Sequence, residues 1–488
     1  MPRRFLIRVF GCQMNRHDAE ALAGLLSRAG LEPTEDESAA DVILFETCSV
    51  RAHAEERVYS LLGRLKPVKR RRPGLVIGVI GCMAEKDREA IFRRAPHVNF
   101  AVGPGRLDEI PELVASCQLP VASGRNSPAD YWQLATGDCH PVLSGHKDRL
   151  ELSSSIADRR EHPWSAFIAI SRGCSCRCAY CIVPSVRGDL VSRPPDEILA
   201  EAERLVAAGA TEIVLLGQNV DAYGRDLNHQ DTKTQRVHKE DAVLVPSLCL
   251  GGLVVRNAKP SLAGLVRAIG ALEPRGLRRL SFVTSHPRDI SEELLRAMAD
   301  TPAVSPYLHM PAQSGSDRIL DAMRRGYTAE RYRELVALAR KLVPGVEIAS
   351  DFIVGFPGET EEDYLATERL VREMEFQQAF VFKYSPRPGT FAAERMADDV
   401  PMEAKKDRNN RLLAVQKEVS LRTNRALVGR TLEVLVEGTS PRDERRLSGR
   451  SRTGRIVVFP RDERVRPGDY VDVRIGSATA LTLAGELV

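Results

Sequence analysis

Residues 170–184, ISRGCSCRCAYCIVP, place four cysteines within eight positions. Free cysteine usually behaves as a small buried hydrophobic residue. Here, however, the apolar alternation of Phe167 to Ile170 stops at Gly173, so the thiols are expected on a loop that follows a strand. Four thiols on one loop indicate metal ligands rather than core packing.

The spacing of these cysteines narrows the choice of metal. If Cys174, Cys178 and Cys181 are the ligands, no fourth protein ligand is obvious nearby, whereas structural zinc takes four. Iron–sulfur clusters are held by thiolates, and C-x3-C-x2-C resembles the signature of the radical S-adenosylmethionine enzymes, whose open iron binds that cofactor. A zinc site and redox thiols are the alternatives. Cys176 gives a spacing that this signature does not use, and we interpret it as a bystander.

Length and composition favour a multidomain globular protein. A chain of 488 residues predicts two to four domains at about 100–200 residues each. Its 43% hydrophobic and 28% charged residues are typical of proteins with large buried cores. The apolar run at residues 5–10 is short and interrupted by Arg8, which argues against a secretory signal or a membrane segment. Ten cysteines without a small disulfide-rich scaffold favour a reducing compartment, and the cytoplasm is expected.

Basic residues are concentrated in two runs, although the net charge is only +4. Residues 64–72 carry six basic side chains and no acid, and residues 442–455 carry six arginines with two acids. Such patches suit a phosphate backbone. A solvated charged surface is the equally simple alternative for each run.

The first hundred residues repeat one pattern. Strands are expected at residues 5–10, 41–45 and 75–80, and each is followed by a cysteine and then a helix: Cys12, Cys48 and Cys82. A fourth strand is expected at residues 99–102. The carboxyl ends of parallel strands share one edge of a sheet. Each cysteine alone is more often a core residue, but three at equivalent positions predict a second metal site.

The central region predicts an open (β/α)6 barrel. Six strands are expected at residues 167–170, 212–216, 279–283, 307–310, 347–354 and 379–384, separated by helical patterns such as residues 195–208. Polar residues at strand carboxyl ends form the sites of βα barrels. The candidates to contact a cofactor or substrate, each of which has a structural role as its alternative, are Gln218, His286, Gln313, Ser314 and Asp351.

The remaining segments set the expected boundaries. We assign residues 1–116 to an α/β domain, 117–162 to a linker, 163–424 to the barrel with an insertion at 225–260, and 425–488 to a small β-barrel. A basic helix is expected at residues 402–425, and short strands at 431–436, 454–459, 470–475 and 481–484. Small arginine-rich barrels often bind RNA. No role is assigned to the insertion or to Cys117, Cys139 and Cys249.

Six motifs, in order, resemble those of the methylthiotransferase family of radical S-adenosylmethionine enzymes. They are GCQMN at residues 11–15, TCSVR at 47–51, GCMA at 81–84, the cysteine loop, LGQNV at 216–220 and GFPGET at 355–360. The resemblance covers nearly the whole chain except the linker and the insertion. It implies an N-terminal Rossmann-like methylthiotransferase domain, a radical S-adenosylmethionine barrel and a C-terminal TRAM domain.

The resemblance also implies the cofactors and their ligands. Cys174, Cys178 and Cys181 would hold the cluster that binds S-adenosylmethionine, and Cys12, Cys48 and Cys82 an auxiliary [4Fe–4S] cluster. Two positions depart from the family: Glu46 replaces the usual Asn before Thr-Cys, and Cys176 replaces a bulkier residue. Neither change removes a ligand. A carboxylate at Glu46 is expected to lower the reduction potential of the auxiliary cluster.

The implied reaction is addition of a methylthio group to C2 of N6-isopentenyladenosine at tRNA position 37, with two S-adenosylmethionine molecules. One is cleaved to a 5′-deoxyadenosyl radical that activates C2, and the other methylates a sulfur carried on the auxiliary cluster. An unactivated aromatic C–H requires such cofactor chemistry. The expected partners are a tRNA anticodon stem-loop, an electron donor and a sulfur source of unknown identity, with no membrane; a monomer is expected.

Three alternatives remain open. Sister enzymes of the family modify threonylcarbamoyl-adenosine in tRNA or an aspartate of a ribosomal protein, and the arginine-rich C-terminal domain favours RNA here. Outside enzymes, the chain is compatible with an RNA-binding iron–sulfur sensor. A sensor predicts a cluster with all its irons bound by protein, and the missing fourth ligand argues against it.

Overall fold

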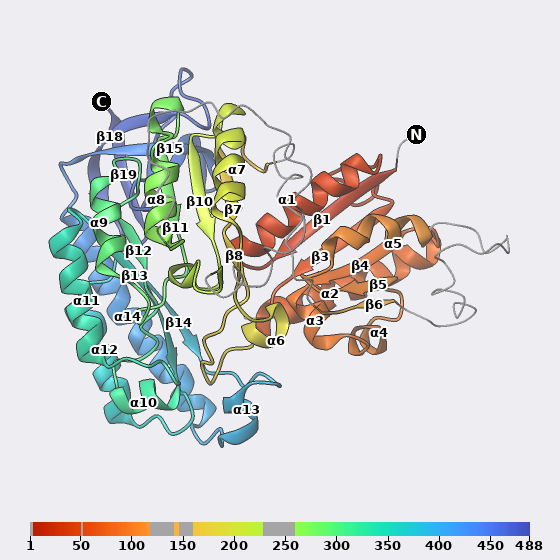
Figure 1. Cartoon of the computed structure of the whole chain (residues 1–488), viewed down its shortest axis with the longest axis horizontal. Coiled ribbons are helices and arrows are strands. Elements are labelled where there is room, and N and C mark those ends of the chain that lie inside the picture. Colours follow the sequence, from red (N-terminus) through yellow and green to blue (C-terminus); the bar gives the residue numbers. More distant parts are fainter. Residues whose placement is uncertain (1–2, 50–51, 118–140, 146–159, 228–258) are drawn as a thin grey trace, which may run out of the picture.

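The computed structural model describes residues 3–49, 52–117, 141–145, 160–227 and 259–488. It confirms the predicted fold class of an α/β domain, a central parallel barrel-like domain and a small C-terminal β-barrel. Figure 1 shows the N-terminal α/β domain (red to orange) beside the central domain, with the C-terminal strands (blue) packed against one end of the latter. Cys139, Cys249 and most of the expected insertion lie outside the described residues.

The N-terminal domain is a parallel sheet of order β2-β1-β3-β4-β5-β6. Its strands are β1 (Arg4–Phe10), β2 (Glu32–Pro33), β3 (Val42–Thr47), β4 (Val76–Gly81), β5 (Phe100–Val102) and β6 (Val142–Leu143). One face packs on α1 (Gln13–Arg28) and α5 (Ile110–Ser116), and the other on α2 (Ala52–Arg71), α3 (Cys82–Asp87) and α4 (Ala90–Arg94). Strands β3 and β4 are buried along their whole length, as expected for a sheet covered on both faces.

Strand β6 is a feature that the sequence did not predict. It lies within residues 117–162, which we had interpreted as a linker, and pairs in parallel with β5. The chain therefore returns to the first domain before it enters the central one. Cys117 follows α5 and packs against the apolar cluster on that face of the sheet, so its position is structural.

The six predicted strands of the central domain are confirmed. They are β7 (Ser165–Ala169), β10 (Glu212–Leu216), β11 (Arg279–Phe282), β12 (Tyr307–His309), β13 (Glu347–Val354) and β14 (Gln378–Lys383). They form two parallel halves, β7-β10-β11 and β12-β13-β14, joined through a bridge between Leu280 and Val304. The surrounding helices are α7 (Pro195–Ala207), α8 (Leu262–Gly270), α9 (Glu292–Asp300), α10 (Asp317–Ala322), α11 (Ala329–Leu342), α12 (Glu361–Met374), α13 (Phe391–Arg395) and α14 (Met402–Arg425).

The C-terminal domain is a closed five-stranded barrel of order β15-β16-β17-β19-β18. Its strands are β15 (Thr431–Ser440), β16 (Asp443–Ser451), β17 (Ile456–Pro460), β18 (Tyr470–Ala478) and β19 (Thr482–Leu487). Four strands were expected, and the fifth, β16, coincides with the second basic run. Its apolar and small residues face the barrel interior while its arginines face outward, which is the alternation of a half-buried strand.

The C-terminal barrel docks on the amino ends of the central strands. Arg278, just before β11, forms an ion pair with Glu433 of β15 (2.8 Å). Glu347, the first residue of β13, accepts from Arg455 at 2.7 Å. This end of the strands is opposite to the end that carries the cysteine loop.

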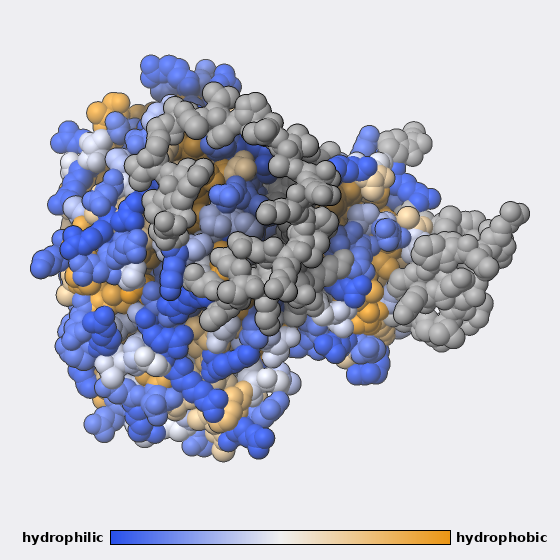
Figure 2. Space-filling view, viewed as in Figure 1, coloured by the Kyte–Doolittle hydropathy of each residue, from blue (hydrophilic) through white to orange (hydrophobic). Residues whose placement is uncertain are grey.

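The visible surface of the described residues is predominantly hydrophilic, with hydrophobic residues in small groups (Figure 2). Among the helices that the structure describes, we find none with the length and apolar character needed to span a membrane.

Candidate active site

Three cysteines meet at one edge of the N-terminal sheet. Strands β1, β3 and β4 are neighbours, and their last residues, Phe10, Thr47 and Gly81, are in register. Cys12, Cys48 and Cys82 follow these residues and therefore share the carboxyl edge of three adjacent strands. We call these cysteines the strand-edge trio. Their convergence in space was predicted from the sequence, and the register accounts for it.

A short polar network shapes the turn that presents Cys12. Cys12 precedes α1, and the Asn15 carboxamide oxygen accepts from both its backbone N (3.1 Å) and its Sγ (3.2 Å). A Cβ on Gly11 would lie only 2.1 Å from that oxygen, so the turn requires glycine. The Asn15 amide nitrogen donates to Glu46 Oε1 at 2.6 Å. The same asparagine thus links the cysteine turn to β3.

Burial and hydrogen bonding shift the pKa values of the strand-edge thiols in opposite directions. A hydrogen bond from Cys48 lowers the pKa of Cys12 to about 6. Burial raises the pKa of Cys82 to about 11 and that of Glu46 well above its usual range. Burial therefore favours the neutral carboxylic acid at Glu46, whereas the sequence interpretation assumed a carboxylate. The effect of Glu46 on a cluster potential stays a prediction.

An arginine from the central domain reaches the strand-edge trio. Arg187 is the last residue of the short helix α6 (Val183–Arg187), directly after the cysteine loop. Its Nε donates to Cys82 Sγ at 3.2 Å, and its Nη2 pairs with Asp18 Oδ2 at 2.8 Å. All three side chains are buried. A buried ion pair of this kind fixes the two domains in one arrangement, because breaking it leaves an uncompensated charge.

The second set of thiols lies on the predicted loop after β7 and the two-residue strand β8 (Ser171–Arg172). Gly173 has a φ of +73°, and a Cβ there would lie 2.0 Å from the carbonyl oxygen of Asp189. Glycine is therefore required where the loop begins. We call Cys174, Cys178 and Cys181 the loop trio. Their loop is fixed by backbone hydrogen bonds, from Cys174 N to Gly188 O (3.1 Å) and from Cys181 N to Cys178 O (3.1 Å).

A buried arginine also contacts the loop trio. Arg325 Nη1 donates to Cys178 Sγ at 3.4 Å, and its Nη2 donates to the carbonyl oxygen of Pro311 at 2.9 Å. Burial raises the pKa of Cys181 to about 12. A cation beside these thiols stabilises the thiolate form that ligates metals. Each trio thus has one buried guanidinium within hydrogen-bonding distance of one sulfur.

Cys176 has different neighbours from the loop trio. Its sulfur accepts from Asn219 Nδ2 at 3.5 Å and from Arg288 Nη2 at 3.3 Å. A hydrogen bond from Cys174 lowers the pKa of Cys176 to about 6. These contacts give Cys176 polar partners of its own. Its interpretation as a bystander stays a prediction.

A cavity of about 230 Å³ opens beside the loop trio. Its lining includes Cys174 and Cys176 together with four charged residues, Arg225, Asp226, Arg288 and Asp289. Asn219 also lines it and donates to Asp289 Oδ2 at 2.7 Å. Sequence reasoning selected Gln218 in this motif and missed Asn219, Arg288 and Asp289. Their positions after strands β10 and β11 were the available signal.

The other predicted contact residues are not among those that line this cavity. Ser314 is buried against Thr367 (3.3 Å between their oxygens), and His286 Nδ1 accepts from the backbone N of Arg288. Asp351 Oδ1 lies 3.2 Å from His309 Nε2. Gln313 has a φ of +69°, and its buried Oε1 has no partner within the described residues, as is also true of Gln218 Oε1. The roles of these five residues stay predictions.

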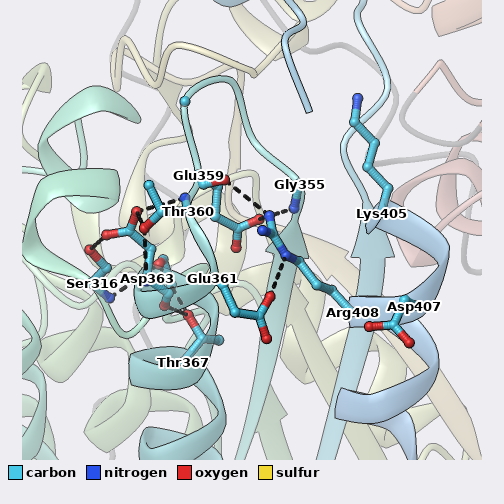
Figure 3. A network of polar contacts seen from close by, with 12 residues as sticks. Ser316, Gly355, Glu359, Thr360, Glu361, Asp363, Thr367, Lys405, Asp407 and Arg408 are labelled. Atoms are coloured by element: carbon cyan, nitrogen blue, oxygen red, sulfur yellow. Dashed lines mark hydrogen bonds and ion pairs between the residues drawn. The ribbon is translucent and has the colours of Figure 1, made fainter. Parts of the chain in front are cut away.

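The GFPGET motif contributes to an apolar cluster shared with the cysteine loop and to a separate polar network. Figure 3 shows Glu359 between the backbone N of Gly355, which donates to it, and Arg408 of α14, which pairs with it at 3.2 Å. Burial raises the pKa of Glu359 to about 7. Phe356 of the motif belongs to the same buried apolar cluster as Ala179 of the cysteine loop. The role of the polar network is structural, because it fixes the end of β13 and the start of α12.

The two trios fit iron–sulfur clusters better than single metal ions. Among the described residues, no three His, Cys, Asp or Glu side chains are close enough together to hold one metal ion. The thiolates of a [4Fe–4S] cluster bind different irons and so stand further apart than the ligands of one ion. The partly buried thiols and the two adjacent guanidinium groups suit an anionic cluster.

Family models match the three domains in turn. Residues 4–103 match "Uncharacterized protein family UPF0004", residues 168–371 the radical SAM superfamily, and residues 425–488 the TRAM domain. The chain is also similar in fold to a radical S-adenosylmethionine methyltransferase from Kitasatospora setae, with a TM-score of 0.51, 16% identity, and coverage of 80% of this chain and 77% of that one. At that identity the likeness supports the fold alone.

Curated relatives match along nearly the whole chain. The tRNA-2-methylthio-N(6)-dimethylallyladenosine synthase of Streptomyces viridosporus is 42% identical over 490 residues, which cover 99% of this chain and 87% of the relative. That of Thermobifida fusca is 42% identical over 479 residues, with 97% and 87% covered. For the relative of Mycobacterium avium, also 42% identical, the match covers 98% of this chain and 61% of the relative's length.

These matches confirm the enzyme class expected from the six motifs, a radical S-adenosylmethionine enzyme whose cofactors are [4Fe–4S] clusters and S-adenosylmethionine. They span all three domains and therefore include both cysteine trios. The chain belongs to the family of the tRNA-2-methylthio-N(6)-dimethylallyladenosine synthases.

Proposed function

We propose that this protein adds a methylthio group to C2 of N6-dimethylallyladenosine next to the anticodon of tRNA. The observation that carries the proposal is an apolar contact between the strand-edge trio and the segment that directly follows the loop trio. Cys82 of the strand-edge trio packs against Ile182, the residue directly after Cys181 of the loop trio. A radical source and a sulfur source must act on one carbon atom, so their sites have to adjoin.

The loop trio is the proposed site of the cluster that binds S-adenosylmethionine. In the adjacent cavity Arg225 and Arg288 both pair with Asp289, at 2.7 and 3.3 Å, and the carboxylate and amine of S-adenosylmethionine would exchange into these pairs. The strand-edge trio is the proposed site of the auxiliary cluster. When bound, these cofactors supply radical cleavage of S-adenosylmethionine and a sulfur atom for transfer.

The residues of the chain align the sites and limit access of water. Arg187 fixes the N-terminal domain against the loop, through Cys82 and Asp18. Cys48, Cys82 and Cys174 are buried, which limits the access of solvent to a reactive site. Alignment and exclusion of water are what a protein contributes when a cofactor performs the chemistry.

RNA as the substrate is supported by the C-terminal barrel. Arg446 and Arg450 of β16 face outward at alternate positions from the buried Leu447 and Gly449. An outward row of guanidinium groups on a small barrel suits a phosphate backbone. This placement favours RNA over the ribosomal-protein aspartate.

The test is a product analysis with defined RNA. Anaerobically reconstituted protein is incubated with dithionite, S-adenosylmethionine and tRNA that carries N6-dimethylallyladenosine. We expect 5′-deoxyadenosine and a methylthio nucleoside by mass spectrometry, and neither from a Cys178→Ala control. A parallel reaction uses tRNA with threonylcarbamoyl-adenosine. A methylthio product from that tRNA alone would overturn the proposed substrate, and no 5′-deoxyadenosine from any tRNA would overturn the enzyme class.

A further inference from the structure

A second cavity, of about 190 Å³, lies on the N-terminal domain outside both cysteine trios. It opens between the exposed side of β1 and helix α2, which Figure 1 shows packed along the sheet. Six of its lining residues combine rings and charges: Arg8, Phe10, Glu37, Phe45, Arg57 and Arg64. Neither the family match nor the proposed cluster sites account for this combination.

Two of the residues that line this cavity are aromatic. Phe10 and Phe45 stack with their ring centroids 6.1 Å apart and an angle of 19° between the planes. The guanidinium of Arg57 lies over Phe10, 5.5 Å from its centroid. A planar cation above a ring makes a wall on which a nucleobase can stack.

The rim of the cavity carries an excess of positive charge. Arg8 pairs with Glu37 at 3.6 Å. Within the described part of the chain, neither Arg57 nor Arg64 forms an ion pair, and both are exposed. The basic run of residues 64–72 continues from Arg64 along α2. Two unpaired guanidinium groups beside a stacking surface complement the phosphate and the base of one nucleotide.

The cavity adjoins the strand-edge trio through the chain itself. Phe10 is separated from Cys12 by Gly11 alone, and Phe45 lies three residues before Cys48. Phe10 is the last residue of β1 and lies at the carboxyl edge of the sheet, and Phe45 is level with Arg8, two residues before the end of β3. An RNA whose adenosine reaches the strand-edge trio therefore brings a neighbouring nucleotide within reach of this cavity.

We propose that this cavity binds an unpaired nucleotide of the RNA loop that flanks the modified adenosine. The inference rests on the proposed function, and it names the contact that holds the loop on the N-terminal domain. A free inorganic anion would leave the phenyl rings unused. A nucleotide can place its base against Phe10, which is half-buried, whereas Phe45 is buried beneath it. Stacking on aromatic side chains is how proteins recognise single-stranded RNA.

The test uses full-length reconstituted protein and a synthetic anticodon stem-loop RNA with 2-aminopurine beside N6-dimethylallyladenosine. We expect the wild type to change the 2-aminopurine fluorescence through stacking. Arg57→Glu and Arg64→Glu should each weaken RNA binding by about tenfold and lower the salt dependence by about one unit of slope per lost phosphate contact. Their iron content should equal that of the wild type.

A matched control has the same charge change elsewhere on the domain. Arg28→Glu lies at the far end of α1, exposed and at the opposite edge of the sheet, and should bind RNA as the wild type does. Equal binding by Arg57→Glu and the wild type, with an unchanged fluorescence signal, would overturn the proposal. So would an equal loss of binding in Arg28→Glu, because the effect would then be one of net charge.

A measurement on the wild type alone guards against misfolded variants. 4-Thiouridine placed next to the modified adenosine should crosslink to peptides that contain Phe10 or Arg57, and crosslinks elsewhere only would contradict the proposal. These readouts report binding and not turnover. If the RNA binds in this way but no methylthio product forms, the proposed function fails while the cavity assignment stands.

Discussion

The two cysteine trios reach the same number of ligands by different routes. The loop trio comes from one segment of eight residues, held in shape by Gly173 and by local hydrogen bonds. The strand-edge trio is gathered from three segments, and only the parallel pairing of β1, β3 and β4 brings it together. One site depends on local conformation and the other on the whole fold of its domain. The strand-edge trio should therefore be more sensitive to changes outside its ligands.

The first way to test this comparison is to remove each trio in turn. We expect about eight irons per chain in the wild type and about four after either triple Cys→Ala substitution, as for two cubane clusters. Loss of the loop trio should abolish formation of 5′-deoxyadenosine. Loss of the strand-edge trio should retain it but abolish the methylthio product. Iron analysis and product chromatography provide the readouts, and iron that stays at about eight in either variant would refute that assignment.

The second test compares the two buried arginines. Arg187→Gln should destabilise the protein by about 3–5 kcal/mol, because Asp18 stays buried without its partner. Arg325→Gln should cost about 1–3 kcal/mol, because it removes hydrogen bonds to the Pro311 carbonyl and to the Tyr180 and Tyr327 hydroxyls and leaves no buried carboxylate unpaired. Denaturant midpoints measure both.

A double variant controls the first of these substitutions. Asp18→Asn combined with Arg187→Gln removes both charges and should recover much of the lost stability. If Arg325→Gln proves the more damaging single change, the strand-edge trio is not the more dependent site.

The third test concerns Glu359 in the GFPGET motif and the pH dependence of stability. Burial raises the pKa of Glu359 from 4.5 in a free chain to about 7. The folded protein therefore holds a proton that the unfolded chain releases, so stability falls as pH rises from about 4.5 to about 7, by at most about 3 kcal/mol. Glu359→Gln should lose this slope. Parallel unfolding curves of the two proteins across that pH range would contradict the expectation.

The smallest expected effect is at Cys176. In a background without the strand-edge trio, Cys176→Ser should keep about four irons, because Cys176 already has Asn219 and Arg288 as partners. Cys174→Ser in the same background is the matched comparison and should lose them. Iron loss in Cys176→Ser would make this cysteine a ligand and change the loop trio.

Local patterns in the sequence predicted most of the fold. The buried apolar runs marked each strand of the central domain, and the recurrence of cysteine after β1, β3 and β4 predicted the strand-edge trio. Strand β16 was missed although Leu447, Gly449 and Ser451 alternate with exposed residues, because the density of arginine suggested only a charged surface. Strand β6 has two residues and no pattern of its own, so only its pairing with β5 defines it.

The contacts between domains were beyond prediction from the sequence. Arg187 follows the cysteine loop, and nothing in the sequence around it predicts its partners. Its hydrogen bonds to Cys82 and Asp18 depend on how the two domains pack. Arg325 and Cys178 belong to the same domain but are 147 residues apart, so their contact depends on the closure of the barrel. Motif spacing identified the ligands, whereas the charges that stabilise them come from residues distant in sequence.

The docking of the C-terminal barrel at the amino ends of the central strands has a consequence for the shape of the substrate. Strand β13 has eight residues, which at about 3.3 Å each make about 26 Å between the two ends of the domain. An RNA that contacts both the arginines of β16 and the end of the central domain that carries the loop trio must extend at least that far. A helical stem beneath the loop is then a requirement for tight binding, and progressive shortening of the stem should release the barrel contact while the loop still enters the site.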